Sequence, residues 1–519
     1  MTLFDGGTFF GREPKYGIGW SDEEILQRAK ETGTAMMLAT HWEAIYFDML
    51  SGNERMLQIA KKFPEQIAPL AVINPQHYDC TTDYIEKIKA DGFAGIACFP
   101  YYQGWRPARY AFHKLVHDVA AAGFPLQVAI GSVDELSELV GVIRDVTTPV
   151  LVRWVRGGGY IAIADIIAIA KDFSHIFFDV GNLVTLGGVA YLAKTIGADR
   201  LYLATNMPLV YEACPQLLLE TAKLSESDKD QIGFGILANI FKSFVISSVS
   251  EKSGSQQRPD LSTPLRSGRD DNNVVAWKAH LTRPKIDIHW HAEGWDLIEP
   301  CTGVEAARDV IKDFNYEALI VSSILALNYD LKQGNANTAM WTEKDPRIHG
   351  YIVYDPTRIE ESLAELEKYK NHPAFVGVKT IQDYYPLPLS DEKYQPMIQW
   401  ARDNGWPILC HRNGVSKVAA AFPTVQFVTA HMTRERMPEF VSPPNVIIDI
   451  SGSYAHRGET DLEAMVAAFG PDRILFAADG PLMTPAWSIG KIIGANLDEA
   501  VLEKIYRANA RRVFKRLRV

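Results

Sequence analysis

Cysteine is scarce in this chain. Five of the 519 residues are cysteines, an odd number, and no two of them form a C-x-x-C pair. A scattered set of thiols is typical of a reduced compartment, whereas secreted domains stabilised by disulfides carry paired cysteines. We therefore expect an intracellular, cytoplasmic protein.

Long apolar runs and an excess of basic charge are also missing. The apolar stretch YIAIADIIAIAKDF is interrupted by Asp165 and Lys171, well short of the roughly 18 residues that suggest a membrane span. The start, MTLFDGGTFF, has no basic segment ahead of an apolar one, so no signal peptide is expected. The net charge of −10 argues against nucleic acid or an anionic membrane as a partner, and we expect a small-molecule substrate.

The chain does contain an internal duplication. YFDMLSGN at 46–53 matches NYDLKQGN at 328–335, and FAGIACF at 93–99 matches FVGVKTI at 375–381, both 282 residues later. GADRLYLATNMPL at 197–209 matches GPDRILFAADGPL at 470–482, 273 residues later. An offset that shrinks in this way indicates one duplicated domain in which loops changed length while strands were retained.

The segment between the two copies differs in composition from both. Residues 246–283 are rich in Ser, Gly, Pro and charged residues over most of their length and show no apolar periodicity. Such a composition is typical of a linker. The predicted organisation is a first domain at 1–245, a linker at 246–283 and a second domain at 284–519.

Short apolar runs alternate with helical patterns within each copy. In the second copy eight runs, from KIDIHW at 285–290 to RILFAAD at 473–479, are separated by segments such as TRIEESLAELEKY, whose apolar residues recur at helical spacing. Eight such units predict an α/β fold of two tandem (β/α)8 TIM-type barrels. An open doubly wound sheet is the alternative.

Histidines end several of the predicted strands of the second copy. His289 and His291 end the first run, two residues apart and therefore on one face of a strand. His411 ends the fifth run, His431 the sixth, and Asp479 the eighth. Because barrel enzymes place their chemistry at the carboxyl ends of the strands, we expect these side chains to meet.

Several imidazoles together with a carboxylate suit a divalent metal ion. Zinc is the first expectation, with manganese or iron as alternatives, and one ion is favoured over two. Such an ion polarises a carbonyl group or acidifies a water molecule, while a nearby histidine or aspartate transfers the proton.

Four motifs in this copy carry a resemblance to a known family. IDIHWH, ILCH, FVTAHM and ILFAADGP, in this order and each at a predicted strand end, resemble the amidohydrolase superfamily. Within it they are most similar to the amidohydrolase-related branch that contains aminocarboxymuconate-semialdehyde-type decarboxylases. The resemblance spans about 285–519. It implies that the metal ligands are His289, His291, His411 and Asp479, that His431 is the catalytic histidine, and that Asp479 also acts as a base.

Two cationic residues near this set allow more than one interpretation. Lys379, at the end of the fourth run, suits a carbamylated bridge between two metals as in other branches of the superfamily, a contact to a substrate anion, or a salt bridge. Arg412, next to His411, suits a clamp for a carboxylate or phosphate, or a structural ion pair. Both are candidate substrate-binding residues.

The first copy lacks the predicted metal ligands. In chain order, Gly7, Phe9, Ala129 and Asn206 take the places of His289, His291, His411 and Asp479. We interpret this copy as a degenerate, pseudoenzyme barrel. Its expected role is to pack against the second barrel, to shape that barrel's site, or to bind something else.

These observations predict a metal-dependent hydrolase of an amide, ester or lactone-type acyl bond, with its site in the second barrel. The alternative is a non-oxidative decarboxylase of an aromatic or unsaturated carboxylic acid that uses the same residues. A third hypothesis is a non-catalytic binding protein. The sequence leaves open the substrate, the role of the linker and whether the chain forms a homo-oligomer.

Overall fold

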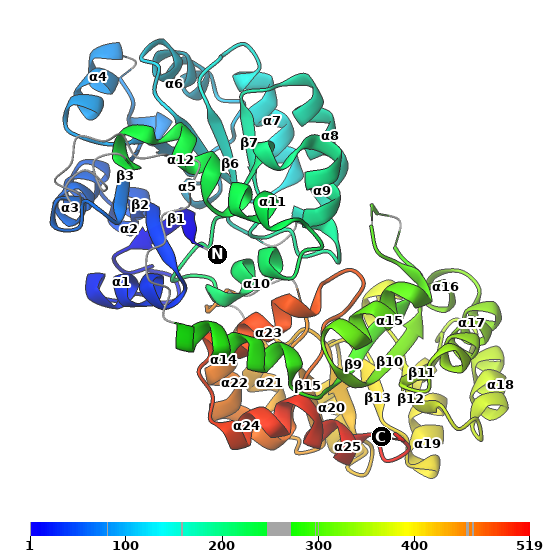
Figure 1. Cartoon of the computed structure of the whole chain (residues 1–519). Helices are drawn as coiled ribbons and strands as arrows, with labels where there is room; N and C mark the ends of the chain where they lie inside the picture. Colours follow the sequence, from blue (N-terminus) through cyan, green and yellow to red (C-terminus); the bar gives the residue numbers. More distant parts are fainter. Residues whose placement is uncertain are drawn as a thin grey trace. The chain divides into compact units, whose positions relative to one another are not determined.

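The computed structural model of the chain describes residues 2–79, 81–156, 159–245, 271–295, 297–298, 300–452, 456–458 and 461–518. The chain divides into two compact units, 1–276 and 277–519. Each unit contains one parallel eight-stranded sheet whose strands follow one another in sequence order, with helices between them (Figure 1). The predicted pair of tandem (β/α)8 barrels is confirmed.

The first barrel closes between its first and last strands. A bridge from Thr8 to Met207 joins β1 to the segment after β8, and the Phe9 amide donates to the Met207 carbonyl at 2.8 Å. The strands are β1 (Leu3–Phe10), β2 (Thr34–His41), β3 (Ile67–Val72), β4 (Gly95–Cys98), β5 (Leu126–Ile130), β6 (Val150–Trp154), β7 (Ile176–Asp179) and β8 (Leu201–Tyr202).

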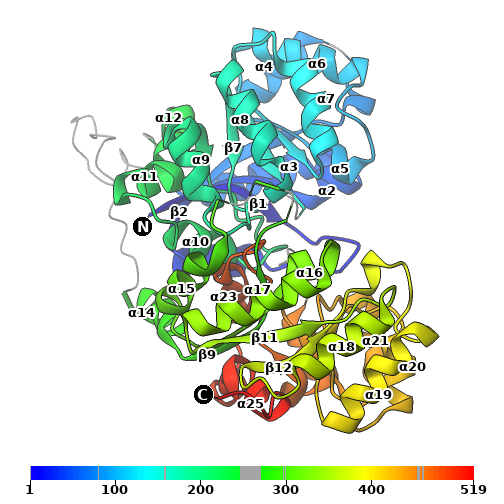
Figure 2. The ribbon, with the colours of Figure 1, turned by 90° about the vertical axis from the view of Figure 1, so that its right-hand side faces the viewer.

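Helices surround this barrel on the outside, as Figure 2 shows for α6 to α9. The helices are α1 (Asp22–Glu31), α2 (Trp42–Tyr46), α3 (Met49–Lys62), α4 (Thr82–Ala90), α5 (Pro100–Gln103), α6 (Tyr110–Ala121), α7 (Val133–Ile143), α8 (Ile163–Asp172), α9 (Gly188–Ile196), α10 (Ala213–Glu220), α11 (Glu226–Asp230) and α12 (Ile236–Ile240).

The second barrel closes in the same way, through a bridge between Trp290 and Gly480. Each of the eight strands expected from the sequence is present, although several are shorter than their apolar runs. They are β9 (Lys285–Ala292), β10 (Tyr316–Ser323), β11 (Ile348–Val353), β12 (Phe375–Lys379), β13 (Ile408–Cys410), β14 (Phe427–Thr429), β15 (Val446–Asp449) and β16 (Ile474–Leu475).

The helices of the second barrel bury apolar faces against these strands. The last of them leads to Phe514, which is fully buried in a core cluster with Ile286, Ile320 and Leu409. The helices are α14 (Asp271–Thr282), α15 (Gly303–Asp313), α16 (Ile324–Asn328), α17 (Leu331–Lys344), α18 (Ile359–Tyr369), α19 (Gln395–Asn404), α20 (Val415–Ala421), α21 (Met437–Phe440), α22 (Leu462–Phe469), α23 (Pro485–Gly494), α24 (Glu499–Glu503) and α25 (Asn509–Val513).

The duplicated SGN and QGN segments lock a helix onto a strand in both barrels. The side-chain oxygen of Asn335 on α17 accepts a hydrogen bond from the Val353 amide, and Asn53 on α3 accepts one from Val72, both at 2.9 Å. A Cβ on the glycine before each asparagine would lie 2.1 Å or 2.2 Å from an alanine backbone nitrogen. Close helix packing therefore requires these glycines, which is why the motif survives in both copies.

The predicted linker is partly helical. Residues 271–282 form α14, and His280 on this helix contacts the hydroxyl of Tyr506 at 3.0 Å. The rest of the predicted linker, 246–270, lies outside the described residues. Within the described part of the chain, no helix is long and apolar enough to cross a membrane.

Candidate metal centre

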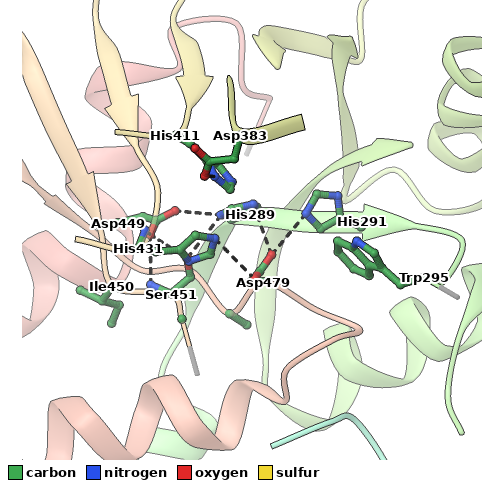
Figure 3. A network of polar contacts seen from close by, with 12 residues as sticks. His289, His291, Trp295, Asp383, His411, His431, Asp449, Ile450, Ser451 and Asp479 are labelled. Atoms are coloured by element: carbon green, nitrogen blue, oxygen red, sulfur yellow. Dashed lines mark hydrogen bonds and ion pairs between the residues drawn. The ribbon is translucent and has the colours of Figure 1, made fainter. Parts of the chain in front are cut away.

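Three histidines converge on one carboxylate at the carboxyl ends of the second barrel's strands (Figure 3). Oδ1 of Asp479 lies 3.3 Å from Nε2 of His289 and 3.2 Å from Nε2 of His291. Oδ2 of the same residue lies 3.6 Å from Nε2 of His431. Asp479, which follows β16, is therefore the common neighbour of imidazoles from β9 and from the end of β14.

The other ring nitrogen of every histidine in this group has a partner on a neighbouring element. The Nδ1 contacts are His289 with Asp449 Oδ2 at 2.9 Å, His291 with Ser322 Oγ at 3.2 Å, His411 with Asp383 Oδ2 at 2.6 Å and His431 with Ser451 Oγ at 3.0 Å. A carboxylate on Nδ1 fixes the ring and keeps the proton on that nitrogen, so that Nε2 of His289 and of His411 carries a lone pair that can accept a hydrogen bond or bind a metal.

Ser451 determines the tautomer of His431. The Ser451 hydroxyl donates its proton to Oδ1 of Asp449 at 2.7 Å, so its oxygen accepts from Nδ1–H of His431. The lone pair of His431 therefore lies on Nε2, the atom nearest Asp479.

Burial sets the protonation states of the site. It lowers the pKa of His289, His291 and His411 to about 4, so these imidazoles are neutral at neutral pH. Burial acts to raise the pKa of Asp479, but the neighbouring histidines outweigh it and hold that pKa below its usual value. Neutral imidazoles and an ionised carboxylate are the forms that bind a divalent metal.

The aspartate at the end of the seventh strand has a different pKa in the two barrels. Burial raises the pKa of Asp179 in the first barrel to about 7, although three backbone amides donate to its side chain. Burial also acts to raise the pKa of its equivalent, Asp449, but the hydrogen bond and charge of His289 bring it to about 2. The aspartate at this position thus contacts a histidine ring only in the second barrel.

A buried lysine lies within the group. Nζ of Lys379, at the end of β12, is 2.9 Å from Nε2 of His289 and is fully buried. Burial lowers the pKa of Lys379 to about 8, while Asp479 and Asp449 act to raise it. An ammonium at this position offsets part of the negative charge of Asp479 and Asp449.

The donor set fits a divalent metal ion. Donor atoms of His289, His431 and Asp479 lie within 4.8 Å of one another, and no other such group of three exists among the described residues. Imidazole nitrogens and a carboxylate oxygen are ligands for zinc, manganese or iron, so the chemistry of the site alone does not choose among them.

A family model described as Amidohydrolase matches residues 329–516. Most of the second barrel is thus similar to the amidohydrolase family, and we call this unit the amidohydrolase barrel. The match includes His411, His431 and Asp479, and it begins after β9, which carries the other two histidines. No curated protein matches the chain.

Several solved structures are similar to part of this chain. They include 5-carboxyvanillate decarboxylase from Sphingomonas paucimobilis (14% identity, TM-score 0.37, covering 45% of this chain and 99% of that chain) and 2,6-dihydroxybenzoate decarboxylase from Rhizobium (17%, 0.35, 45% and 98%). A dihydroxybenzoic acid decarboxylase from Polaromonas sp. JS666, with bound manganese and the inhibitor 2-nitroresorcinol, is a third (17%, 0.39, 46% and 98%).

The structure places the other predicted site residues close by. The ring of His411 lies 5.2 Å from the ring of His431 between centroids. Arg412 donates through Nη1 to the backbone carbonyl of His431 and, at 3.5 Å, to Oγ1 of Thr433. This Arg412 nitrogen therefore supports the loop after β14, and its predicted role as an anion clamp stays a prediction.

Sequence reasoning missed the residues that hold the histidines. Asp449, Ser451 and Ser322 all lie at or just after strand ends, as the predicted ligands do. Asp449 was visible as the last residue of the seventh strand. Comparison with the first copy did not indicate its role, because an aspartate, Asp179, is also present there and accepts hydrogen bonds from backbone amides.

An arginine fills the centre of the first barrel. Arg153 on β6 is buried, and its Nε donates to Oδ1 of Asn206 at 2.8 Å. Its Nη1 donates to Oε1 of Gln127 at 3.3 Å, and its guanidinium lies 4.3 Å from the ring centroid of Phe9. Gly7, Phe9 and Asn206 are the equivalents of His289, His291 and Asp479, so a cation of the chain itself stands among the positions that form the metal centre in the amidohydrolase barrel.

Aromatic rings cover this arginine. Phe9 stacks on Trp42 with centroids 4.0 Å apart, and Trp42 stacks on Tyr46 at 5.7 Å. Tyr102 contacts Phe9, Trp42 and Tyr46 at 5.4 to 6.3 Å. We call Phe9, Trp42, Tyr46 and Tyr102 the aromatic layer.

Proposed function

We propose that the amidohydrolase barrel is a metal-dependent hydrolase that cleaves an amide, ester or lactone-type acyl bond. The observation that supports this most is the contact of 3.6 Å between Nε2 of His431 and Oδ2 of Asp479, beside the imidazoles of His289 and His291. It places two groups that can carry a proton next to a set of metal donors.

His289, His291, His411 and Asp479 would hold the metal, as the family resemblance implies. When bound, a divalent ion polarises a substrate carbonyl and lowers the pKa of water, which makes water a nucleophile at neutral pH. Lys379 must then turn its Nζ from His289 toward the carboxylates, because an ammonium and a metal ion cannot share one nitrogen lone pair.

His431 and Asp479 supply the proton transfers. Nε2 of His431 has a free lone pair, because Ser451 holds the proton on Nδ1. It can accept the proton of an attacking water and return it to the leaving group, while Asp479 stabilises the imidazolium formed in between. Water and an acyclic amide or ester give an acid and an amine or alcohol, whereas water and a lactone give one hydroxy acid, so the overall reaction needs no other reactant.

An aromatic wall favours a second candidate, non-oxidative decarboxylation of an aromatic carboxylic acid. The ring of Trp295 stands edge-on to His291 with centroids 4.6 Å apart. The Trp295 indole donates to the hydroxyl of Tyr384 at 3.0 Å, which joins the loops after β9 and β12 beside the site. Flat rings stack on such side chains, and His431 would then deliver a proton to the ring carbon that loses carbon dioxide.

Product analysis distinguishes the two reactions. Metal-loaded protein is incubated in H₂¹⁸O with a panel of amides, esters and lactones and, separately, of hydroxylated benzoates. Hydrolysis puts ¹⁸O into a new carboxylate, on one of two fragments from an amide or ester and on the single ring-opened product from a lactone, whereas decarboxylation releases carbon dioxide and puts no ¹⁸O into the aromatic product. His431→Ala should lower kcat by about 10²-fold or more, and His372→Ala, outside the site, should not. If neither class of compound turns over, both candidates are wrong.

A further inference from the structure

A second site, unrelated to the metal centre, lies on the first barrel. A cavity of about 610 Å³ opens among the loops that follow β2, β3 and β4. These loops are at the carboxyl ends of the strands, where barrel proteins bind their ligands, and the volume is in the range of small-molecule sites.

The aromatic layer separates this cavity from the barrel centre. Tyr46 and Tyr102 belong to the layer and also line the cavity. Behind Tyr46 come Trp42 and then Phe9, which lies against Arg153. A ligand in the cavity therefore meets tyrosine rings and is kept away from the buried guanidinium.

The charge of the lining is negative. Asp48 and Asp79 line the cavity, and no lysine or arginine does. Hydrogen bonds from Ser51 hold the pKa of Asp48 below its usual value, so this carboxylate is ionised at neutral pH. No lining side chain would give a carboxylate or phosphate ligand a cationic partner, whereas a positive charge would find two carboxylates.

The lining suits an organic cation better than a metal ion. Asp48, Asp79 and His77 are not close enough to form a three-residue metal group, since the described residues contain only the one around Asp479. Tyrosine faces attract ammonium groups that are too weakly hydrated to need oxygen ligands. Nζ of Lys15 lies 5.5 Å from the ring centroid of Tyr46, so this ring already has an ammonium group near it.

We propose that this cavity binds an organic ammonium ion, with its positive charge between Asp48 and Asp79 and its alkyl groups against Tyr46, Tyr84 and Tyr102. The first barrel is then a binding domain for an amine or quaternary ammonium compound. This function is independent of catalysis in the amidohydrolase barrel.

The test is calorimetric titration of the full chain with choline and with its uncharged isostere, 3,3-dimethylbutan-1-ol. Choline should saturate one site per chain, and the alcohol should bind about tenfold more weakly or worse, because it lacks only the charge. Asp79→Asn and Asp48→Asn should each weaken choline binding about fivefold. Asparagine also caps helices, so α3 is retained in the second variant.

Asp172→Asn is the matched control, since Asp172 is an exposed acid of the same barrel outside the cavity. It should leave choline binding unchanged. No heat and no broadening of the choline methyl resonance at 10 mM ligand (roughly the 3 kcal/mol limit of binding) would overturn the proposal. Equal affinity for the alcohol, or full choline affinity in both cavity variants, would overturn it as well.

Discussion

The guanidinium of Arg153 lies flat against Gly7. A Cβ built on Gly7 would come within 2.2 Å of Cζ of Arg153, closer than two unbonded atoms can approach. Arginine at 153 and glycine at 7 therefore depend on each other. In the amidohydrolase barrel the equivalent of Gly7 is His289, and the equivalent of Arg153 is Ala430.

This contact predicts coupling between the two positions. Gly7→Ala should destabilise the first barrel by about 2 kcal/mol or more, because a methyl group meets the guanidinium. In an Arg153→Ala background the same change should cost about 1–2 kcal/mol less, because the space is empty. Urea denaturation of wild type, Gly7→Ala, Arg153→Ala and the double variant measures this difference.

Arg200 offers a control in the same barrel. Its guanidinium donates to the backbone carbonyls of Ala170 and Ile176 at 2.9 Å and 2.6 Å, and it does not contact Gly7. Arg200→Ala should destabilise the barrel yet leave the effect of Gly7→Ala unchanged. If the effects of Gly7→Ala and Arg153→Ala are additive as well, the two positions are not coupled, because the Arg153 side chain can move away from the added methyl group.

Metal content should depend on the histidines of β9. His291→Ala removes an imidazole next to Asp479. We expect wild type to hold about one equivalent of metal per chain and the purified variant to lose it. His372→Ala, at a histidine that precedes β12 and whose ring lies against Tyr369 and Phe375, should keep it. Mass spectrometry of the metals gives the result, and a metal-loaded, fully active His291→Ala chain would contradict the assignment.

Asp449 should tune metal affinity without being a ligand. Asp449→Asn keeps the shape of the side chain but removes the charge that holds Nδ1–H of His289. We expect metal affinity to fall about 10- to 100-fold, as when a histidine loses its supporting carboxylate. Competition with a fluorescent chelator measures it. Asp472→Asn, at an exposed acid paired with Lys504, should have no effect.

Lys379 should oppose metal binding. Its Nζ contacts the donor atom of His289, so Lys379→Met removes a positive charge beside the ion and should tighten binding about tenfold. The count should remain one metal per chain, because the described residues hold a single group of donors. A fall from two equivalents to one or fewer would instead mean that Lys379 bridges two metals.

The metal-free protein should lose stability in acid. The pKa values of His289, His291 and His411 are about 4 when folded and 6.5 in the unfolded chain. Between these values the unfolded chain binds protons that the folded chain does not, so the free energy of unfolding decreases as the pH falls from 6.5 to 4. Urea denaturation across this range checks it, and His291→Gln should flatten the slope.

The sequence was sufficient for the barrels and for the residues that end their strands. Apolar runs and the duplication predicted all eight strands of the second barrel, and His289, His291 and Asp479 meet as expected from their places at strand ends. The partners of those residues could not be predicted, because contacts such as His289 with Asp449 join positions 160 residues apart.

The centre of the first barrel shows the same limit more strongly. Nothing in the pattern VLVRW marks Arg153 as a residue directed at Asn206 and Gln127, since arginine on a strand is usually solvated. Comparison of the copies showed which ligands were missing. It could not show that Arg153 takes the space of those ligands. The equivalent of Arg153 in the second barrel is Ala430, which is not a predicted site residue.

The four Nδ1 contacts have a consequence for how the metal centre forms. Asp449, Ser322, Asp383 and Ser451 belong to the barrel itself and orient the histidine rings through Nδ1. We therefore expect metal uptake to require little reorganisation, so that binding is fast and reversible and a chelator strips the ion while leaving the barrel intact. In that case the folded barrel, more than the ion, sets the positions of the ligands.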